Sequence, residues 1–119
     1  MRFSHLVFSS LAVMMVGSAS AQTISEAQMR AANMARMQAE VLNGGLGKYS
    51  PADCMHQSGG ADCLVSETPA GYLFRFQGGA PGWAAMGRPA SLETEVLVSP
   101  DGRSLRVEYN GPIRTRVNP

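Results

Sequence analysis

The spacing of apolar residues changes once along this chain, and that change limits the folds that it can adopt. Over residues 23–42 the apolar side chains recur with the 3.6-residue period of a helix. From residue 63 onward they alternate with polar side chains, as they do in strands. This order predicts an α+β domain, in which one helix covers one face of an antiparallel sheet.

The helix is predicted over residues 23–42. Thr23 and Glu26 fit a T-x-x-E capping box, in which each side chain bonds a backbone N–H of the first turn. Asn43-Gly44-Gly45 would end the helix, because glycine readily adopts the left-handed conformation there. The face expected to cover the sheet comprises Ala27, Ala31, Met34, Gln38 and Val41, widened by Ile24, Met37 and Leu42.

Three methionines of this helix, Met29, Met34 and Met37, allow two interpretations. Thioethers can bind copper. They also fill irregular gaps in a core, and we favour this role because no M-x-x-M or histidine pattern appears elsewhere.

Two β-hairpins are predicted after the helix, around the turns Thr68-Pro69-Ala70-Gly71 and Ser99-Pro100-Asp101-Gly102. The predicted architecture is therefore one N-terminal helix packed on a four-stranded antiparallel sheet made of two hairpins. Register follows from keeping the apolar residues on one face. The predicted pairs are Val65 with Phe74, Cys63 near Phe76, Val96 with Leu105, Thr94 with Val107, and Glu95 with Arg106.

The first 21 residues have the features of a secretory signal peptide. Arg2 precedes the apolar run LVFSSLAVMMV, and the small residues Ala19-Ser20-Ala21 predict cleavage after Ala21. The run is shorter than the ~20 residues of a membrane-spanning helix, so we expect no stable membrane insertion after cleavage; an uncleaved anchor is the alternative. The expected organisation is a signal peptide (1–21), a single small globular domain (22–112) and a flexible tail (113–119), exported to the periplasm or the extracellular space.

Cys54 and Cys63 are the only cysteines. In an exported domain two cysteines most simply pair, and Gly59 and Gly60 would let the enclosed loop turn back. A metal site is an alternative, although the spacing matches no zinc pattern. Its ligands would be Asp53, Cys54, His56, Asp62 and Cys63. A redox pair would usually have C-x-x-C spacing. We therefore expect a structural disulfide, with no metal and no cofactor.

The charge balance argues against one class of partner. Loss of Arg2 with the leader leaves nine basic and nine acidic residues. A domain without net charge lacks the electrostatic footprint of a nucleic-acid-binding protein, so nucleic acid is not an expected partner.

The segment GGAPGWAAMGRP, residues 78–89, joins the two predicted hairpins and contains the only tryptophan. Connections of this length often carry function. In one interpretation Trp83 stacks on a sugar, base or peptide group while Arg88 binds an anionic or carbonyl group. In the other, Trp83 folds back over the sheet edge, or over Leu73 and Leu97, and closes the core. Trp83 and Arg88 are the candidate binding residues.

No set of catalytic residues is complete in the sequence. His56 could form a triad with Ser58 and Asp62, but one short loop cannot easily position all three. Glu93 and Glu95 could act as paired carboxylates, although such residues on one strand face more simply keep it soluble. We therefore expect no enzyme.

A GG-x-PGW segment followed by SLETE-x-x-VSPDG lies within residues 54–112. This part of the chain resembles small, exported, uncharacterised bacterial proteins, which implies an exported single domain and no particular activity. The expected function is that of an exported, non-catalytic domain that binds an unknown protein, peptide or envelope component. The alternative is a small secreted hydrolase or metal-handling protein around His56.

Overall fold

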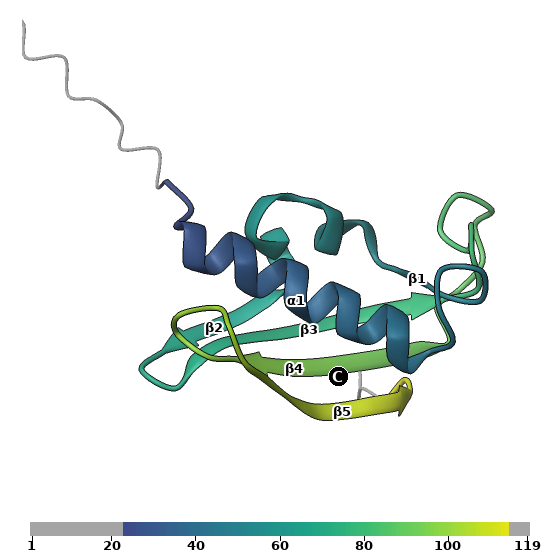
Figure 1. Cartoon of the computed structure of the whole chain (residues 1–119). Coiled ribbons are helices and arrows are strands. Elements are labelled where there is room, and N and C mark those ends of the chain that lie inside the picture. The colour runs from purple at the N-terminus through teal and green to yellow at the C-terminus, as the bar shows by residue number, and fades with distance from the viewer. Residues whose placement is uncertain (1–22, 115–119) are drawn as a thin grey trace, which may run out of the picture.

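The computed structural model describes residues 23–114, which form three helices and an antiparallel sheet (Figure 1). The helices are α1 (Glu26–Leu42) and the short 3-10 helices η1 (Asp53–His56) and η2 (Ser58–Cys63). The strands are β1 (Ser50–Pro51), β2 (Leu64–Thr68), β3 (Gly71–Gly79), β4 (Leu92–Val98) and β5 (Leu105–Pro112). The predicted leader and residues 115–119 of the predicted tail lie outside the described residues.

β3 pairs with three other strands. β4 pairs along one edge, and β5 continues the sheet beyond β4. Along the other edge, β2 pairs with the first half of β3 and β1 with its last two residues. α1 crosses one face of this sheet (Figure 1), so the predicted α+β architecture is confirmed. The prediction lacked β1, a strand of two residues between the helix and the first predicted hairpin.

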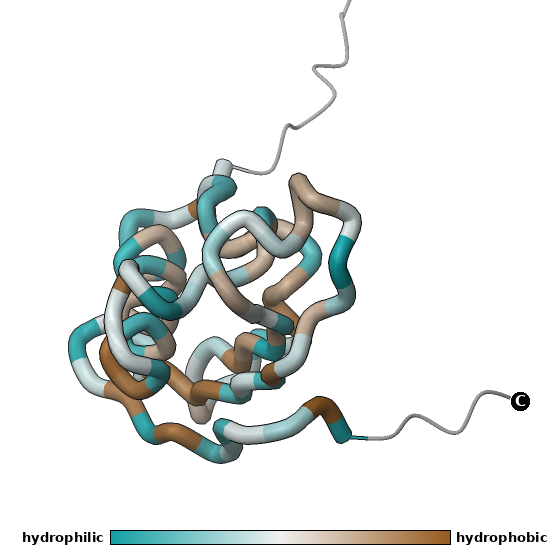
Figure 2. Tube along the Cα trace, turned by 90° about the vertical axis from the view of Figure 1, so that its right-hand side faces the viewer, coloured by the Kyte–Doolittle hydropathy of each residue, from teal (hydrophilic) through white to brown (hydrophobic). Residues whose placement is uncertain are grey.

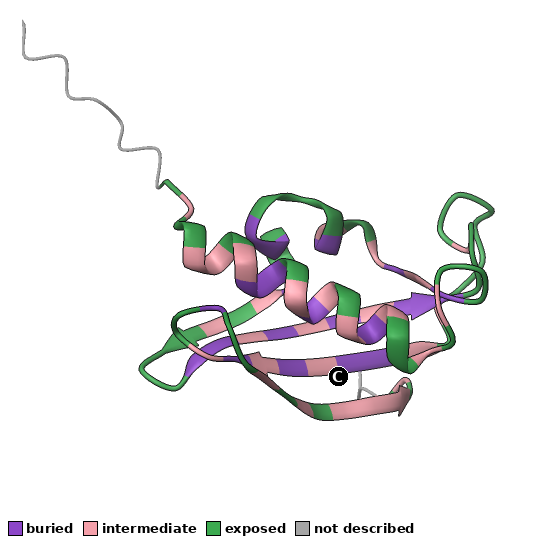
Figure 3. Cartoon of the chain, in the orientation of Figure 1, coloured by how far each residue is buried: buried purple, intermediate pink, exposed green. Residues whose placement is uncertain are grey.

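α1 packs on the sheet through alanines rather than through large apolar residues. Its buried residues are Ala31, Ala32, Ala35 and Ala39, which form the purple stripe of α1 in Figure 3. The predicted face is correct only in part. Ala31 is buried and Ala27 and Met34 pack against the core, whereas Met37 and Val41 are 50% and 73% exposed. Alanine side chains let the helix approach closely, and the rings of Tyr72, Phe74 and Phe76 fill the layer beneath. Of the three helix methionines, only Met34 packs against the core.

The start of α1 differs from the predicted capping box. Ser25 is the N-cap, and its hydroxyl accepts a hydrogen bond of 3.1 Å from the Gln28 N–H. Glu26 is thus the first helical residue, whereas the glutamate of a capping box stands at the third. The helix ends at Leu42 as predicted.

A polar contact ties the end of α1 to the edge strand β5. Asn43 and Asn110 exchange two side-chain amide hydrogen bonds of 3.1 Å each. The Thr94 hydroxyl, fully buried on β4, donates to Asn110 over 2.7 Å. Because these groups satisfy one another, they can lie beneath the helix without the cost of unpaired buried polar atoms.

Both predicted turns form, but the first hairpin has a different register. Thr68 pairs with Gly71 around the turn. An irregularity at Val65 places Leu64 opposite Phe74 and leaves Val65 46% exposed. A bulge adds one unpaired residue to a strand, which alternation of apolar residues does not reveal. Figure 2 shows that apolar (brown) and hydrophilic (teal) residues follow one another in short stretches along the described chain.

The second hairpin also departs from the predicted register. The observed pairs are Val98 with Leu105, Val96 with Val107, Leu97 with Arg106, Glu95 with Tyr109, and Thr94 with Asn110. A tighter loop was expected, but β4 and β5 are joined by residues 99–104, and the register shifts again between Glu95 and Val96. The longer loop and the register shift change which residues of β5 lie opposite β4. Val96 and Val98 of β4 nevertheless remain buried.

The segment between α1 and β2 belongs to the core. Tyr49 is 1% exposed, and its ring lies so close to Gly78 that any side chain there would collide with it. Burial raises the pKa of Tyr49 to about 12; Thr94 opposes this shift and Glu40 adds to it. Gly60 has φ 83°, and a Cβ at this position would lie 2.6 Å from the Phe74 ring.

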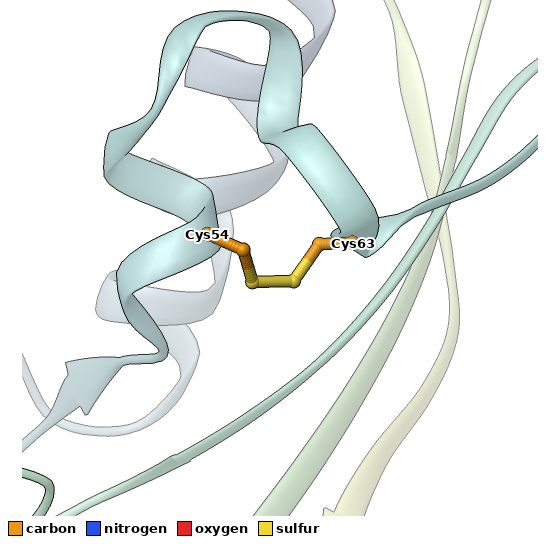
Figure 4. Close-up of a disulfide and its surroundings, with 2 residues drawn as sticks. All are labelled: Cys54 and Cys63. Atoms are coloured by element: carbon orange, nitrogen blue, oxygen red, sulfur yellow. A yellow bond between two sulfur atoms is a disulfide. The ribbon is translucent and has the colours of Figure 1, made fainter.

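The predicted disulfide between Cys54 and Cys63 is confirmed (Figure 4). It joins η1 to the end of η2, with 5.8 Å between the two Cα atoms. The bond therefore closes the segment that links β1 to β2, the two strands that share one edge of β3.

Enlarging the buried face of α1 should destabilise the domain. We expect Ala35→Leu to lower the free energy of unfolding by about 1–3 kcal/mol, because extra methyl groups overfill a packed layer. Met37→Ala, on the exposed side, should change it by less than about 0.5 kcal/mol. Urea unfolding of both variants measures this, and equal losses would contradict the observed helix orientation.

Removing the disulfide should also destabilise the domain. The double variant Cys54→Ala, Cys63→Ala should lose about 2–3 kcal/mol, because the unfolded chain regains the entropy of the opened loop. Thermal unfolding of this variant should match that of the parent protein in reducing agent. If reducing agent left the unfolding midpoint of the parent protein unchanged, this would contradict the structure.

Candidate functional site

Trp83 is fixed in place by contacts at the end of the sheet. Its indole N–H donates a hydrogen bond of 2.9 Å to the Ser50 carbonyl of β1. Its ring stacks over Gly79 at the end of β3, where an added Cβ would lie 3.2 Å from the Trp83 Cγ. Trp83 therefore packs at the sheet edge, six residues along β3 from Leu73, and remains partly exposed.

The loop that carries Trp83 is held by its own hydrogen bonds. Backbone N–H groups of Trp83, Met86 and Arg88 donate to carbonyls within residues 80–83 over 2.8–3.0 Å. Arg88 itself is exposed. The loop extends beyond the end of β1 and β3 (Figure 1), which places it apart from the face covered by α1.

A pocket of about 260 Å³ lies between this loop and the start of η1. Its lining residues are Ser50, Pro51, Asp53, Gly82, Trp83, Ala84 and Ala85. It combines the indole and small apolar groups with the exposed Asp53 carboxylate. Such a pocket can bind an apolar group together with a hydrogen-bond donor or a cation. Of the two predicted binding residues, Trp83 lines this pocket, and Arg88 is not among its lining residues.

The opposite face of the sheet carries a network of charged side chains. Glu95 accepts hydrogen bonds from Arg75 at 2.7 Å and from Arg114 at 3.1 Å, and Arg114 also pairs with Glu93. Arg114 belongs to the segment predicted as a flexible tail, and it was not predicted to contact the sheet. A sequence signal was present, since basic residues follow a strand with two glutamates on one face.

The arginines hold Glu95 in its ionised form. Hydrogen bonding to Arg75 is the main cause that lowers the pKa of Glu95 below 4.5; burial opposes this, and Arg114 adds to the lowering. A carboxyl group in this state is a poor proton donor near neutral pH. Glu93 and Glu95 thus both belong to an ion-pair network with arginine side chains.

His56 and the residues suggested to act with it line different hollows. His56 and Ser58 border a space of about 180 Å³ with Met29, Asn33, Gln57 and Gly59, and no carboxylate lines it. Asp62 lines another cavity, of about 360 Å³, next to Cys63, Phe76 and Glu93. The triad suggested by the sequence is therefore not assembled around one pocket.

Within residues 23–114, no three histidine, cysteine, aspartate or glutamate side chains gather as they would around a metal ion. No helix in this range is long and apolar enough to cross a membrane. No family model, no curated protein and no solved structure matches the chain.

Acid should weaken the domain through Glu95. Because its folded-state pKa is lowered, its ionisation stabilises the fold above pH ~4.5, and this contribution is lost as the pH falls further. At about pH 6, the Glu95→Gln variant should have a lower unfolding midpoint than the parent protein. Between about pH 5 and pH 3, the midpoint of the variant should fall by less than that of the parent. Glu67→Gln, at an exposed position on β2, is the control and should follow the parent. An unchanged acid decrease in Glu95→Gln would contradict this assignment.

Proposed function

We propose that this protein is an exported, non-catalytic domain that binds a protein, peptide or envelope component through the pocket beside Trp83. The observation that carries the proposal is the fixed but partly exposed indole, held by the Ser50 carbonyl and stacked over Gly79. A side chain positioned before binding loses little conformational entropy on contact. An aromatic ring beside a pocket is a frequent anchor of recognition surfaces.

The chemistry of the pocket favours ligands of mixed character. Its apolar wall, formed by Pro51, Trp83 and Ala84, suits an apolar side chain or the face of a sugar ring. Asp53 at its rim suits a hydrogen-bond donor or a cation. Arg88, exposed on the same loop, could contact an anionic or carbonyl group of a larger partner.

Export to the periplasm or the extracellular space forms part of the proposal. The disulfide between Cys54 and Cys63 is consistent with an oxidising compartment, and the leader-like residues 1–21 provide a route to it. The hydrolase or metal-handling alternative finds less support, because the hollow at His56 has no carboxylate on its wall.

Blocking the pocket tests the proposed function. Ala84 and Ala70 are both exposed alanines, at opposite ends of β3. We expect Ala84→Arg to fill the pocket and weaken capture of envelope components by at least about tenfold, or ~1.4 kcal/mol. Ala70→Arg should leave capture unchanged. The measurement is quantitative affinity capture with the mature, oxidised domain.

Thermal unfolding of both variants shows whether either substitution disturbs the fold. Capture by the folded Ala84→Arg variant of the same components, at the same yield as the parent, would refute the pocket as the contact site. Equal losses in the Ala84→Arg and Ala70→Arg variants would also refute it.

A further inference from the structure

The far face of the sheet holds the guanidinium group of Arg114 on three sides. It donates to Glu93 and to Glu95, the second over 3.1 Å, and its central carbon lies 4.1 Å from the centre of the Tyr109 ring. We call Glu93, Glu95 and Tyr109 the arginine cradle. Two of its members stand on β4 and one on β5, so the sheet itself fixes their spacing.

The two carboxylates of the cradle are less exposed than the arginine that they bind. The Glu93 side chain is only 2% exposed and that of Glu95 15%, whereas Arg114 is 44% exposed. Carboxylates removed from water need a positively charged or hydrogen-bonding partner. The acceptors, Glu93 and Glu95, thus lie within the sheet, whereas the donor Arg114 is accessible to solvent.

The shape of the cradle suits a guanidinium better than an ammonium group. A planar guanidinium can stack on Tyr109 while its N–H groups point to two carboxylates in its plane. A lysine ammonium has no such plane and is more strongly hydrated. The cradle therefore distinguishes between the two basic side chains.

A cavity adjoins the cradle. It has a volume of about 360 Å³, and Glu93 lines both the cavity and the cradle. Arg75, which pairs with Glu95, borders it together with Gln77 and the apolar Val65 and Phe76. A peptide with an arginine in the cradle would have space there for a neighbouring residue.

The chain supplies its own occupant from beyond the last strand. β5 ends at Pro112, and Arg114 follows two residues later. A residue outside the sheet can leave the surface without breaking a strand pairing. The strand pairing of β4 and β5, which sets the backbone positions of the cradle residues, does not include Arg114.

We propose that the arginine cradle is a binding site for an arginine side chain of another polypeptide, occupied in this structure by the chain's own Arg114. Arg114 then acts as a competitor that an arginine-bearing partner displaces. This site lies on a different surface from the Trp83 pocket and does not depend on the function proposed for that pocket.

Emptying the cradle tests the proposal. The mature Arg114→Ala protein is titrated with Nα-acetyl-arginine amide and, separately, with Nα-acetyl-lysine amide. We expect the arginine amide to raise the unfolding midpoint saturably and to shift the NMR signals of Tyr109. The lysine amide should bind at least about tenfold more weakly. The parent protein should respond less than the variant, because Arg114 competes.

Two further variants serve as controls for Arg114→Ala. Arg106→Ala removes an exposed arginine of β5 that pairs with Glu108 and should create no arginine binding. A chain ending at Ile113 lacks Arg114 and should bind at least as well as Arg114→Ala. If either emptied protein is unfolded alone, the arginine amide should restore its folded spectrum.

Certain outcomes would overturn the proposal. These are no effect of the arginine amide on either emptied protein, equal effects of the two amides, or an equal response of the parent. Free arginine is the third probe: if it binds as tightly as the amide and an arginine-containing pentapeptide does not bind, the cradle is a site for the amino acid rather than for a polypeptide, and the proposal fails.

Discussion

The rest of this structure depends on how closely α1 can approach the sheet. Four alanines line the contact, and three aromatic side chains of β3 fill the layer beneath them. A small domain has little core, so each contact in this layer carries a large share of its stability. The close approach also brings the end of α1 within hydrogen-bonding distance of β5 through Asn43 and Asn110. It further shapes the disulfide loop, where Gly60 contacts Phe74 without room for a side chain.

Local chemistry made much of the fold predictable. Proline and glycine marked both hairpin turns, a change of period marked the passage from helix to strands, and the two cysteines could pair only with each other. The helix face was not predictable in the same way. A periodicity argument weights large apolar residues, and here Met37 and Val41 are exposed while alanines are buried. The bulges and β1 were not predicted for a related reason, because each involves only one or two residues.

The candidate sites depended on contacts that are remote in sequence. Trp83 was recognised as a residue of interest, but its partner Ser50 lies 33 residues earlier, and nothing in the local pattern indicates that pairing. Arg114 contacts a carboxylate 21 residues away. Residue type could therefore suggest which side chains matter, whereas only the three-dimensional arrangement shows which of them share a surface.

The pairing order of the strands bears on the sequence of events during folding. β3, β4 and β5 each pair with the strand that precedes them in the chain. The strands can therefore pair one after another, and each step closes only a short loop. The surface that covers α1, however, is complete only when both β4 and β5 have joined the sheet. If the protein is exported as proposed and crosses the membrane from its amino end, the helical segment emerges before the sheet that covers it. Both cysteines also emerge ahead of β3. Oxidation can then precede sheet formation, and the crosslinked loop would meet β3 as a preformed unit.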